Sequence, residues 1–160
     1  MGKRLAEPVS SERARELRVV GKYRVLFGDC DPMRVMYYGN YFRLFEVGRA
    51  ELFRQHGHAF VHYIAQGLYL AVIEAQCRYL RPALYDDELE ILAGFSEMSG
   101  ARLRIDYLVR KSGGERVATG FTWHAVVNEQ GRPVRLPQEL RALLRHLLPA
   151  SVAEGEDASD

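Results

Sequence analysis

The residues with the clearest chemical potential are the two acids Asp29 and Asp31, which flank a cysteine in the stretch FGDCDPMRVMYYGNY at residues 27–41. A turn needs Gly, Asn or Pro for its backbone, but it needs no second acid. A carboxylate just upstream of a helix N-terminus lies near unpaired backbone N–H groups, which can bind an oxyanion. A carboxylate and such donors are the minimum equipment for acyl transfer. Asp31 is therefore a candidate nucleophile or general base, and a turn-capping acid is the alternative.

This stretch lies between a predicted strand and a predicted helix. Apolar and basic residues alternate over residues 18–27, which is typical of a strand. Downstream, Asn40 can cap a helix and Gly57 can end it. The apolar residues between them follow one helical stripe: Tyr41, Leu44, Phe45, Gly48 and Leu52. A glycine on that stripe would let a sheet approach the helix backbone closely.

The rest of the chain predicts an antiparallel sheet. Residues 69–79, 88–99, 102–110 and 116–127 alternate with period two, and short turns join most of these runs. In the last run we expect Phe121 and Trp123 on the buried face and His124 on the polar face. A short helix is expected within 59–66, a short strand at 133–136, and a final amphipathic helix with Pro137 at its first turn. The fold class is therefore α+β, with the first long helix covering the apolar face of the sheet.

Composition limits the function classes. The 160 residues suit one domain. The 22 basic and 21 acidic residues give a net charge of +1, which does not indicate binding to nucleic acid or to an anionic membrane. The two cysteines make no disulfide framework, and no apolar run approaches a membrane span, so a cytoplasmic protein is expected. We expect a poorly ordered extension at 1–17, a domain at 18–148 and a disordered acidic tail at 149–160.

The loop also carries a resemblance to a known family. The segments FGDCDP at 27–32 and VMYY at 35–38, with the following Asn40 and Tyr41, resemble the active-site loop of the 4-hydroxybenzoyl-CoA thioesterase family. The similarity extends to the Tol-Pal-associated branch of acyl-CoA thioesterases through FEVGR at 45–49, CRY at 77–79, PALYDD at 82–87 and LE at 89–90. It covers roughly residues 23–144 and implies a hot-dog fold, in which an antiparallel sheet wraps around one long central helix. It also implies a homodimer formed through the sheet, or a homotetramer.

The resemblance assigns roles to particular residues. It implies that Asp31 is the catalytic carboxylate acting on an acyl-CoA, or on the thioester of an acyl-carrier protein, without a metal or other cofactor. The backbone N–H of Tyr38 would polarise the thioester oxygen, Asn40 would cap the helix, and Asp29 would brace the loop. Arg34 stands where the family usually has Gly, and Arg does not cheaply adopt a positive φ. Either the loop path differs, or the side chain points outward, where it could contact a coenzyme A phosphate.

Arg102 matches the place where the hydroxybenzoyl enzyme holds the nucleotide with basic residues. The candidate coenzyme A contacts are therefore Arg34, Asn40 and Arg102.

Three alternatives remain. A non-catalytic hot-dog module that binds acyl-CoA or a protein partner stays open because of Arg34. A phosphatase of the haloacid-dehalogenase type also uses an Asp-x-Asp pair, to bind Mg²⁺, but it requires a parallel sheet. His58 and His62 have the i, i+4 spacing of metal ligands, although no acid or cysteine joins them locally. On the long helix, Glu46 and Arg49 are expected to form an ion pair.

Overall fold

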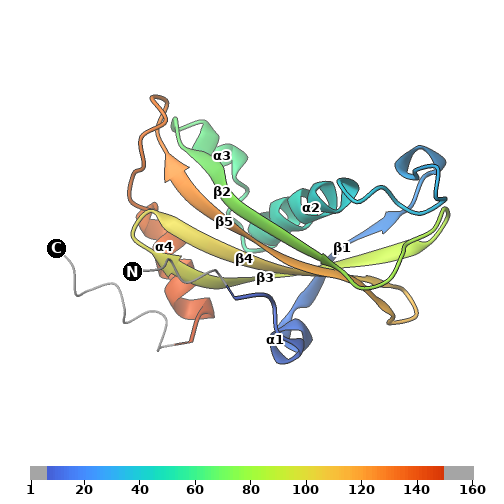
Figure 1. Cartoon of the computed structure of the whole chain (residues 1–160). Helices are drawn as coiled ribbons and strands as arrows, with labels where there is room; N and C mark the ends of the chain where they lie inside the picture. Colours follow the sequence, from blue (N-terminus) through green and yellow to red (C-terminus); the bar gives the residue numbers. More distant parts are fainter. Residues whose placement is uncertain (1–6, 150–160) are drawn as a thin grey trace, which may run out of the picture.

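The computed structural model describes residues 7–149 and contains one five-stranded antiparallel sheet. Its strands are β1 (Arg18–Arg24), β2 (Tyr69–Tyr79), β3 (Glu88–Ser99), β4 (Arg102–Lys111) and β5 (Arg116–Val127), in the order β1-β3-β4-β5-β2. The long helix α2 (Asn40–Gln55) lies along one face of this sheet (Figure 1). All strand pairs are antiparallel, which contradicts the parallel sheet required by the phosphatase alternative. The predicted α+β architecture is confirmed.

Helix α2 is buried along the predicted stripe. Its five stripe residues, from Tyr41 to Leu52, are all buried, and Gly57 follows the helix end with φ 74°. Gly48 allows the predicted close approach, because a Cβ at this position would lie 2.8 Å from Cγ2 of Ile91 on β3. The centre of the contact is a stack of Phe45 on Tyr107, with ring centroids 4.4 Å apart and planes 7° apart. The start of α2 is therefore attached to a rigid core.

The prediction for the faces of β5 was wrong. Gly120 lies under the ring of Phe45, and a Cβ at Gly120 would lie 2.5 Å from Cε2 of that ring, so Gly120 and its even-numbered neighbours face α2. His124 belongs to that face and is fully buried, whereas it was expected on a solvated face. Phe121 lies on the opposite face, where the guanidinium of Arg104 covers its ring at 4.1 Å from the centroid. Because both faces of β5 are covered, alternation of apolar and polar residues did not identify the inner one.

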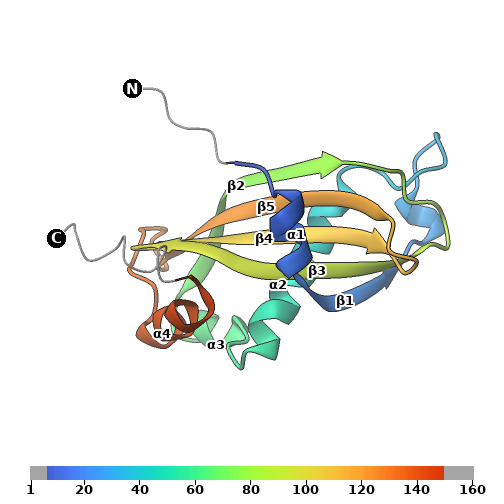
Figure 2. The ribbon, with the colours of Figure 1, turned by 90° about the horizontal axis from the view of Figure 1, so that it is seen from below.

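The outer face of the sheet is covered by the N-terminal segment. Helix α1 (Ser11–Glu16) crosses the strands on the side opposite α2 (Figure 2). Ala14 and Leu17 pack against Leu92 on β3 and Leu108 on β4. Residues 7–17, predicted as part of an extension, thus contain a short helix that packs against the sheet, and the domain boundaries stay predictions. The predicted acidic tail lies outside the described residues except for residue 149.

The remaining elements follow the sequence with small shifts. Helix α3 (Val61–Ile64) forms within the predicted range, and α4 (Gln138–Leu147) has Pro137 at its N-cap. The strand predicted at 133–136 is reduced to a single bridge between Val127 and Pro133. Strand β1 ends at Arg24 because the chain turns into a 3₁₀ helix, η1 (Phe27–Asp29). Within residues 7–149, no helix has the length and apolar character needed to cross a membrane.

Candidate active site

Asp29 anchors the loop between β1 and α2. Its side chain is buried, and Oδ2 accepts hydrogen bonds from the Tyr23 hydroxyl and the Leu26 N–H, each at 2.7 Å. Its backbone carbonyl accepts from the Tyr37 N–H at 2.8 Å and from Nδ2 of Asn40 at 2.9 Å. With four partners, this residue connects the strand end to the helix start. The contacts agree with the bracing role that the resemblance implied.

Asp31 lies in a tight turn that leaves part of its carboxylate free. The Met33 N–H donates to Oδ1 at 2.8 Å, and the Arg34 N–H donates to the Asp31 carbonyl at 2.8 Å. No hydrogen bond to Oδ2 is found among residues 7–149. The side chain is only partly exposed. The turn thus orients the carboxylate through one oxygen and leaves the other able to react.

Arg34 adopts the backbone conformation that favours glycine. Its φ is 64°, so the loop follows a path suited to the glycine usually found there in the family. For a residue with a Cβ this conformation costs about 1–2 kcal/mol. The side chain is exposed at the loop tip. Of the two expectations for Arg34, the outward side chain is observed and the altered path is not.

The first peptides of α2 offer free donors. Neither the Tyr38 N–H nor the Gly39 N–H has a hydrogen-bond partner in the described part of the chain. The carbonyl of Tyr37 accepts from the Asn40 N–H at 3.0 Å, which fixes the peptide that carries the Tyr38 N–H. The prediction of Asn40 as N-cap was wrong: Gly39 takes that position, and Nδ2 of Asn40 is used on the Asp29 carbonyl.

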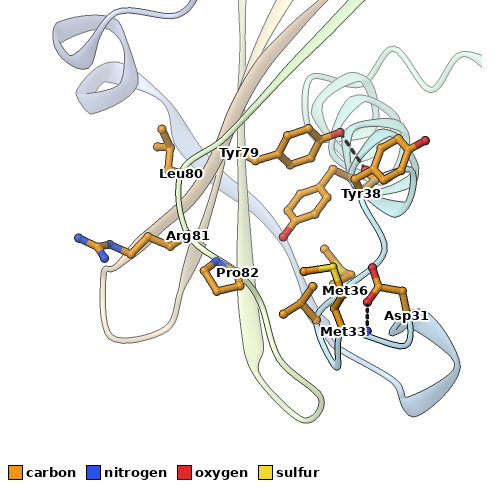
Figure 3. A pocket seen from close by; sticks show the side chains of 10 residues that line it. Asp31, Met33, Met36, Tyr38, Tyr79, Leu80, Arg81 and Pro82 are labelled. Atoms are coloured by element: carbon orange, nitrogen blue, oxygen red, sulfur yellow. Dashed lines mark hydrogen bonds between the residues drawn. The ribbon is translucent and has the colours of Figure 1, made fainter.

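A pocket of about 370 Å³ brings Asp31 and Tyr38 together (Figure 3). The other lining residues are mostly apolar or aromatic: Met33, Val35, Met36, Tyr41, Tyr79, Leu80, Arg81 and Pro82. Tyr79 packs edge-on against Tyr41, with centroids 5.1 Å apart, and its hydroxyl donates to the Tyr38 carbonyl at 3.0 Å. Burial raises the pKa of Tyr41 to about 12, so its hydroxyl stays neutral. A thioester in this pocket would meet a carboxylate and a helix start in an otherwise apolar wall.

The sequence did not identify Tyr79 as a functional residue. Tyr79 is the last residue of β2, and any apolar residue at this position would fit the alternation of apolar and polar residues along that strand. Its hydrogen-bond partner, Tyr38, lies 41 positions earlier in the chain. The only local signal was the CRY segment of the resemblance.

A second set of polar side chains lies buried beneath α2, outside this pocket. The hydroxyls of Tyr107 and Thr122 are 2.7 Å apart, and Oγ1 of Thr122 is 2.6 Å from Nε2 of His124. The Arg49 guanidinium lies near the side chains of Tyr107 and His124, and the predicted ion pair between Arg49 and Glu46 is absent within residues 7–149. Burial, with a smaller contribution from Arg49, lowers the pKa of His124 to about 3. His124 is thus a neutral core residue.

Arg102 does not meet Asp31 within one chain. It lies at the turn between β3 and β4, stacked 5.2 Å from the Trp123 ring centroid, whereas the Asp31 loop packs at the other end of the sheet. The 12 residues of β3 separate these ends by roughly 40 Å.

Comparison with known proteins assigns the family. The family model of the thioesterase-like superfamily matches residues 25–144, which includes the Asp31 loop, α2 and the whole pocket. The chain belongs to the thioesterase-like superfamily. A protein of Aquifex aeolicus named "Putative esterase" is 32% identical over 122 residues, which cover 76% of this chain and 94% of the relative.

Two further proteins are similar to this chain over most of their length. A 1,4-dihydroxy-2-naphthoyl-CoA hydrolase of Thermosynechococcus vestitus is 28% identical over 138 residues, covering 85% of this chain and 90% of the relative. The crystal structure of a "Probable Thioesterase" from Bartonella henselae is 30% identical with a TM-score of 0.70, covering 76% of this chain and 99% of that one. The predicted hot-dog fold of this thioesterase-like chain is therefore confirmed.

Proposed function

We propose that this chain hydrolyses the thioester of an acyl-CoA to the free acid and coenzyme A, with Asp31 as nucleophile or general base. Membership of the thioesterase-like superfamily supports hydrolysis of a thioester. The naphthoyl-CoA hydrolase among the relatives supports coenzyme A as the thiol. The single observation that carries the proposal is the shared pocket of Asp31 and the unpaired start of α2.

Two routes are open to the Asp31 carboxylate. In the nucleophilic route, its free oxygen bonds to the acyl carbon, the C–S bond breaks, and coenzyme A leaves as a thiolate. Water then hydrolyses the mixed anhydride and supplies the proton that the thiolate takes. In the general-base route, Asp31 takes a proton from a water molecule as that water attacks, and the proton passes on to the leaving sulfur.

Both routes put negative charge on the thioester oxygen. We assign donation to that oxygen to the Tyr38 N–H, which has no partner in residues 7–149 and lies at the positive end of α2. The helix is packed on the sheet through Gly48, so this donor is held in place before the substrate arrives. A preorganised donor of this kind typically contributes about 10²–10³ in kcat.

The pocket walls and the loop residues suggest how the substrate lies. Three tyrosines, two methionines, a valine, a leucine and a proline line most of the pocket, which suits an aromatic or medium aliphatic acyl group. Arg34, which is exposed in the loop, is the proposed contact for a coenzyme A phosphate or for the acidic surface of an acyl-carrier protein. Asn40 contributes through the loop it holds. Arg102 could reach the same substrate only from another copy, in the homodimer or homotetramer that the family resemblance implies.

The finer family assignment belongs to the same proposal. The loop sequence FGDCDP supports the 4-hydroxybenzoyl-CoA thioesterase family, and the downstream segments FEVGR, CRY and PALYDD support a place close to its Tol-Pal-associated branch. Tyr38, where that branch often has His, is the feature shared with the hydroxybenzoyl-type enzymes. A non-catalytic acyl-CoA-binding module was kept open by Arg34 alone. Since Arg34 follows the glycine-like path with φ 64°, that feature no longer argues against a catalytic loop.

The test is a panel of acyl-CoA esters, with release of the thiol followed by a thiol dye. We expect turnover by the wild type and a fall in kcat of at least about 10³ in Asp31→Asn, because the amide is neither nucleophile nor base. Asp86→Asn is a matched control: Asp86 is exposed and has φ 70°, which Asn tolerates well. Undiminished turnover in Asp31→Asn would remove Asp31 from the mechanism, and tight binding of every ester without hydrolysis would favour the binding module.

A further inference from the structure

The Tyr79 hydroxyl links the edge strand β2 to the start of α2. It donates to the Tyr38 carbonyl at 3.0 Å, and both residues line the pocket that holds Asp31 (Figure 3). We propose that Tyr79 is a positioning residue that fixes the oxyanion-binding peptides of α2. This inference rests on the proposed thioesterase function and adds a residue to its machinery.

The two peptides around Tyr38 are held by different partners. The peptide before it is fixed by the Asn40 N–H, which donates to the Tyr37 carbonyl at 3.0 Å. The peptide after it depends on Tyr79, because the other donor to the Tyr38 carbonyl, the Tyr41 N–H, is 3.4 Å away. A bond of 3.4 Å is long for an N–H donor. Loss of the Tyr79 hydroxyl therefore leaves the Tyr38 carbonyl with this long bond from the Tyr41 N–H, which holds the peptide less firmly.

Rotation of that peptide would disturb the backbone next to the Tyr38 N–H. The same peptide carries the Gly39 N–H, which has no partner in the described residues. A hydrogen bond accepted by the carbonyl of a peptide polarises its N–H as well as orienting it. Tyr79 thus orients the peptide that carries the Gly39 N–H and limits the rotation of Tyr38, whose own N–H is the proposed oxyanion donor.

The hydroxyl can act only as a donor here, since a carbonyl only accepts. Burial is the main cause that raises the pKa of Tyr79, followed by the adjacent Cys77, so the group remains protonated over the working pH range. Its ring is placed by edge-on contacts with Tyr41 at 5.1 Å and Tyr38 at 6.3 Å. These ring contacts do not involve the hydroxyl, so Tyr79→Phe removes the hydrogen bond and retains the packing.

The test compares Tyr79→Phe with the wild type on the best ester of the panel. We expect kcat to fall about tenfold while KM changes by less than about twofold, because the bond matters most when the oxyanion forms. The pH profile of kcat keeps its shape, since Tyr79 transfers no proton. Tyr69→Phe is the matched control: it makes the same change at the other end of β2, outside the pocket, and is expected to leave kcat unchanged.

A second measurement reads the geometry without turnover. In ¹⁵N correlation spectra, the Gly39 and Tyr38 amide resonances should shift in Tyr79→Phe and stay in place in Tyr69→Phe. An unchanged kcat or unmoved Gly39 resonance in Tyr79→Phe would overturn the inference. A lower kcat together with a changed KM and a lower thermal stability would also overturn it, because these changes together indicate a merely structural role. Loss of one limb of the pH profile of kcat would overturn it as well, because that loss indicates proton transfer by Tyr79. Absence of turnover in the wild type would instead refute the proposed function itself.

Discussion

The buried His124 makes the stability of this protein depend on pH. Burial, and to a smaller extent the Arg49 guanidinium on α2, lower its pKa to about 3, while Tyr107 on β4 and Thr122 face it with neutral hydroxyls. In the unfolded chain the pKa returns to about 6.5. Below pH 6.5 the unfolded state therefore binds a proton that the folded state does not. The free energy of unfolding falls as the pH drops from 6.5 towards 3.

The magnitude follows from the two pKa values. Between pH 7 and pH 5 the proton bound by the unfolded state contributes a loss of about 2 kcal/mol, at 1.36 kcal/mol per pH unit. This figure is insensitive to the folded-state value, because any folded pKa below about 4 gives the same result at pH 5. A loss of this size is a large fraction of the 5–15 kcal/mol typical of a domain.

Urea denaturation of the wild type and His124→Gln at pH 7, 6 and 5 measures this effect. Gln does not titrate, so the wild type should lose about 2 kcal/mol more than the variant over this range. The comparison uses the pH dependence and not the absolute stability, which the substitution itself will lower. His62→Gln, at an exposed position on α3, checks that the difference is specific to the buried ring. Equal pH dependence in the wild type and His124→Gln would refute the assignment of a neutral buried imidazole.

Two other substitutions test the packing and the loop. Gly120→Ala should lower the free energy of unfolding by about 3 kcal/mol, because its Cβ would clash with the Gln76 carbonyl and lie 2.5 Å from Phe45. Gly113→Ala, whose Cβ would have nothing within 4 Å, should be near neutral in the same urea titration. Arg34→Gly should raise the free energy of unfolding by about 0.5 kcal/mol, because glycine adopts the positive φ at this position without strain. In the same Arg34→Gly variant, KM should be higher than in the wild type for a coenzyme A ester and unchanged for a short thioester without phosphates. An equal change in KM for both substrates would exclude a contact between Arg34 and a phosphate.

Local patterns in the sequence predicted the parts of the fold whose contacts are local or one-sided. The stripe from Tyr41 to Leu52 could be read because α2 has one buried side and one exposed side. The Asp31 loop stood out because its acids exceed what a turn needs. Asp29 and Asp31 then differ in the structure as expected: Asp29 accepts four hydrogen bonds, whereas Asp31 has one carboxylate oxygen without a partner in residues 7–149.

The errors arose where the deciding contact is long-range. The inner face of β5 is selected by the Phe45 ring above Gly120, and no pattern within β5 reveals that ring. On the outer face, the planar guanidinium of Arg104 covers the ring of Phe121, and both residues are buried. A charged residue on this face therefore does not indicate that the face is exposed to solvent. The role of Asn40 depends on the Asp29 carbonyl, 11 residues earlier. Side chains with two plausible uses can be assigned only when the distant partner is known.

The contacts of α1 also set an order of events during synthesis. Nε of Arg13 pairs with Oδ2 of Asp106 at 3.0 Å, and the two residues are 93 positions apart. At 5–20 residues per second, a ribosome needs roughly 5–20 s to make the chain between them. During that interval residues 7–17 cannot yet make their full set of contacts with β4. Their polar composition suits a segment that is exposed to water until that strand has been made.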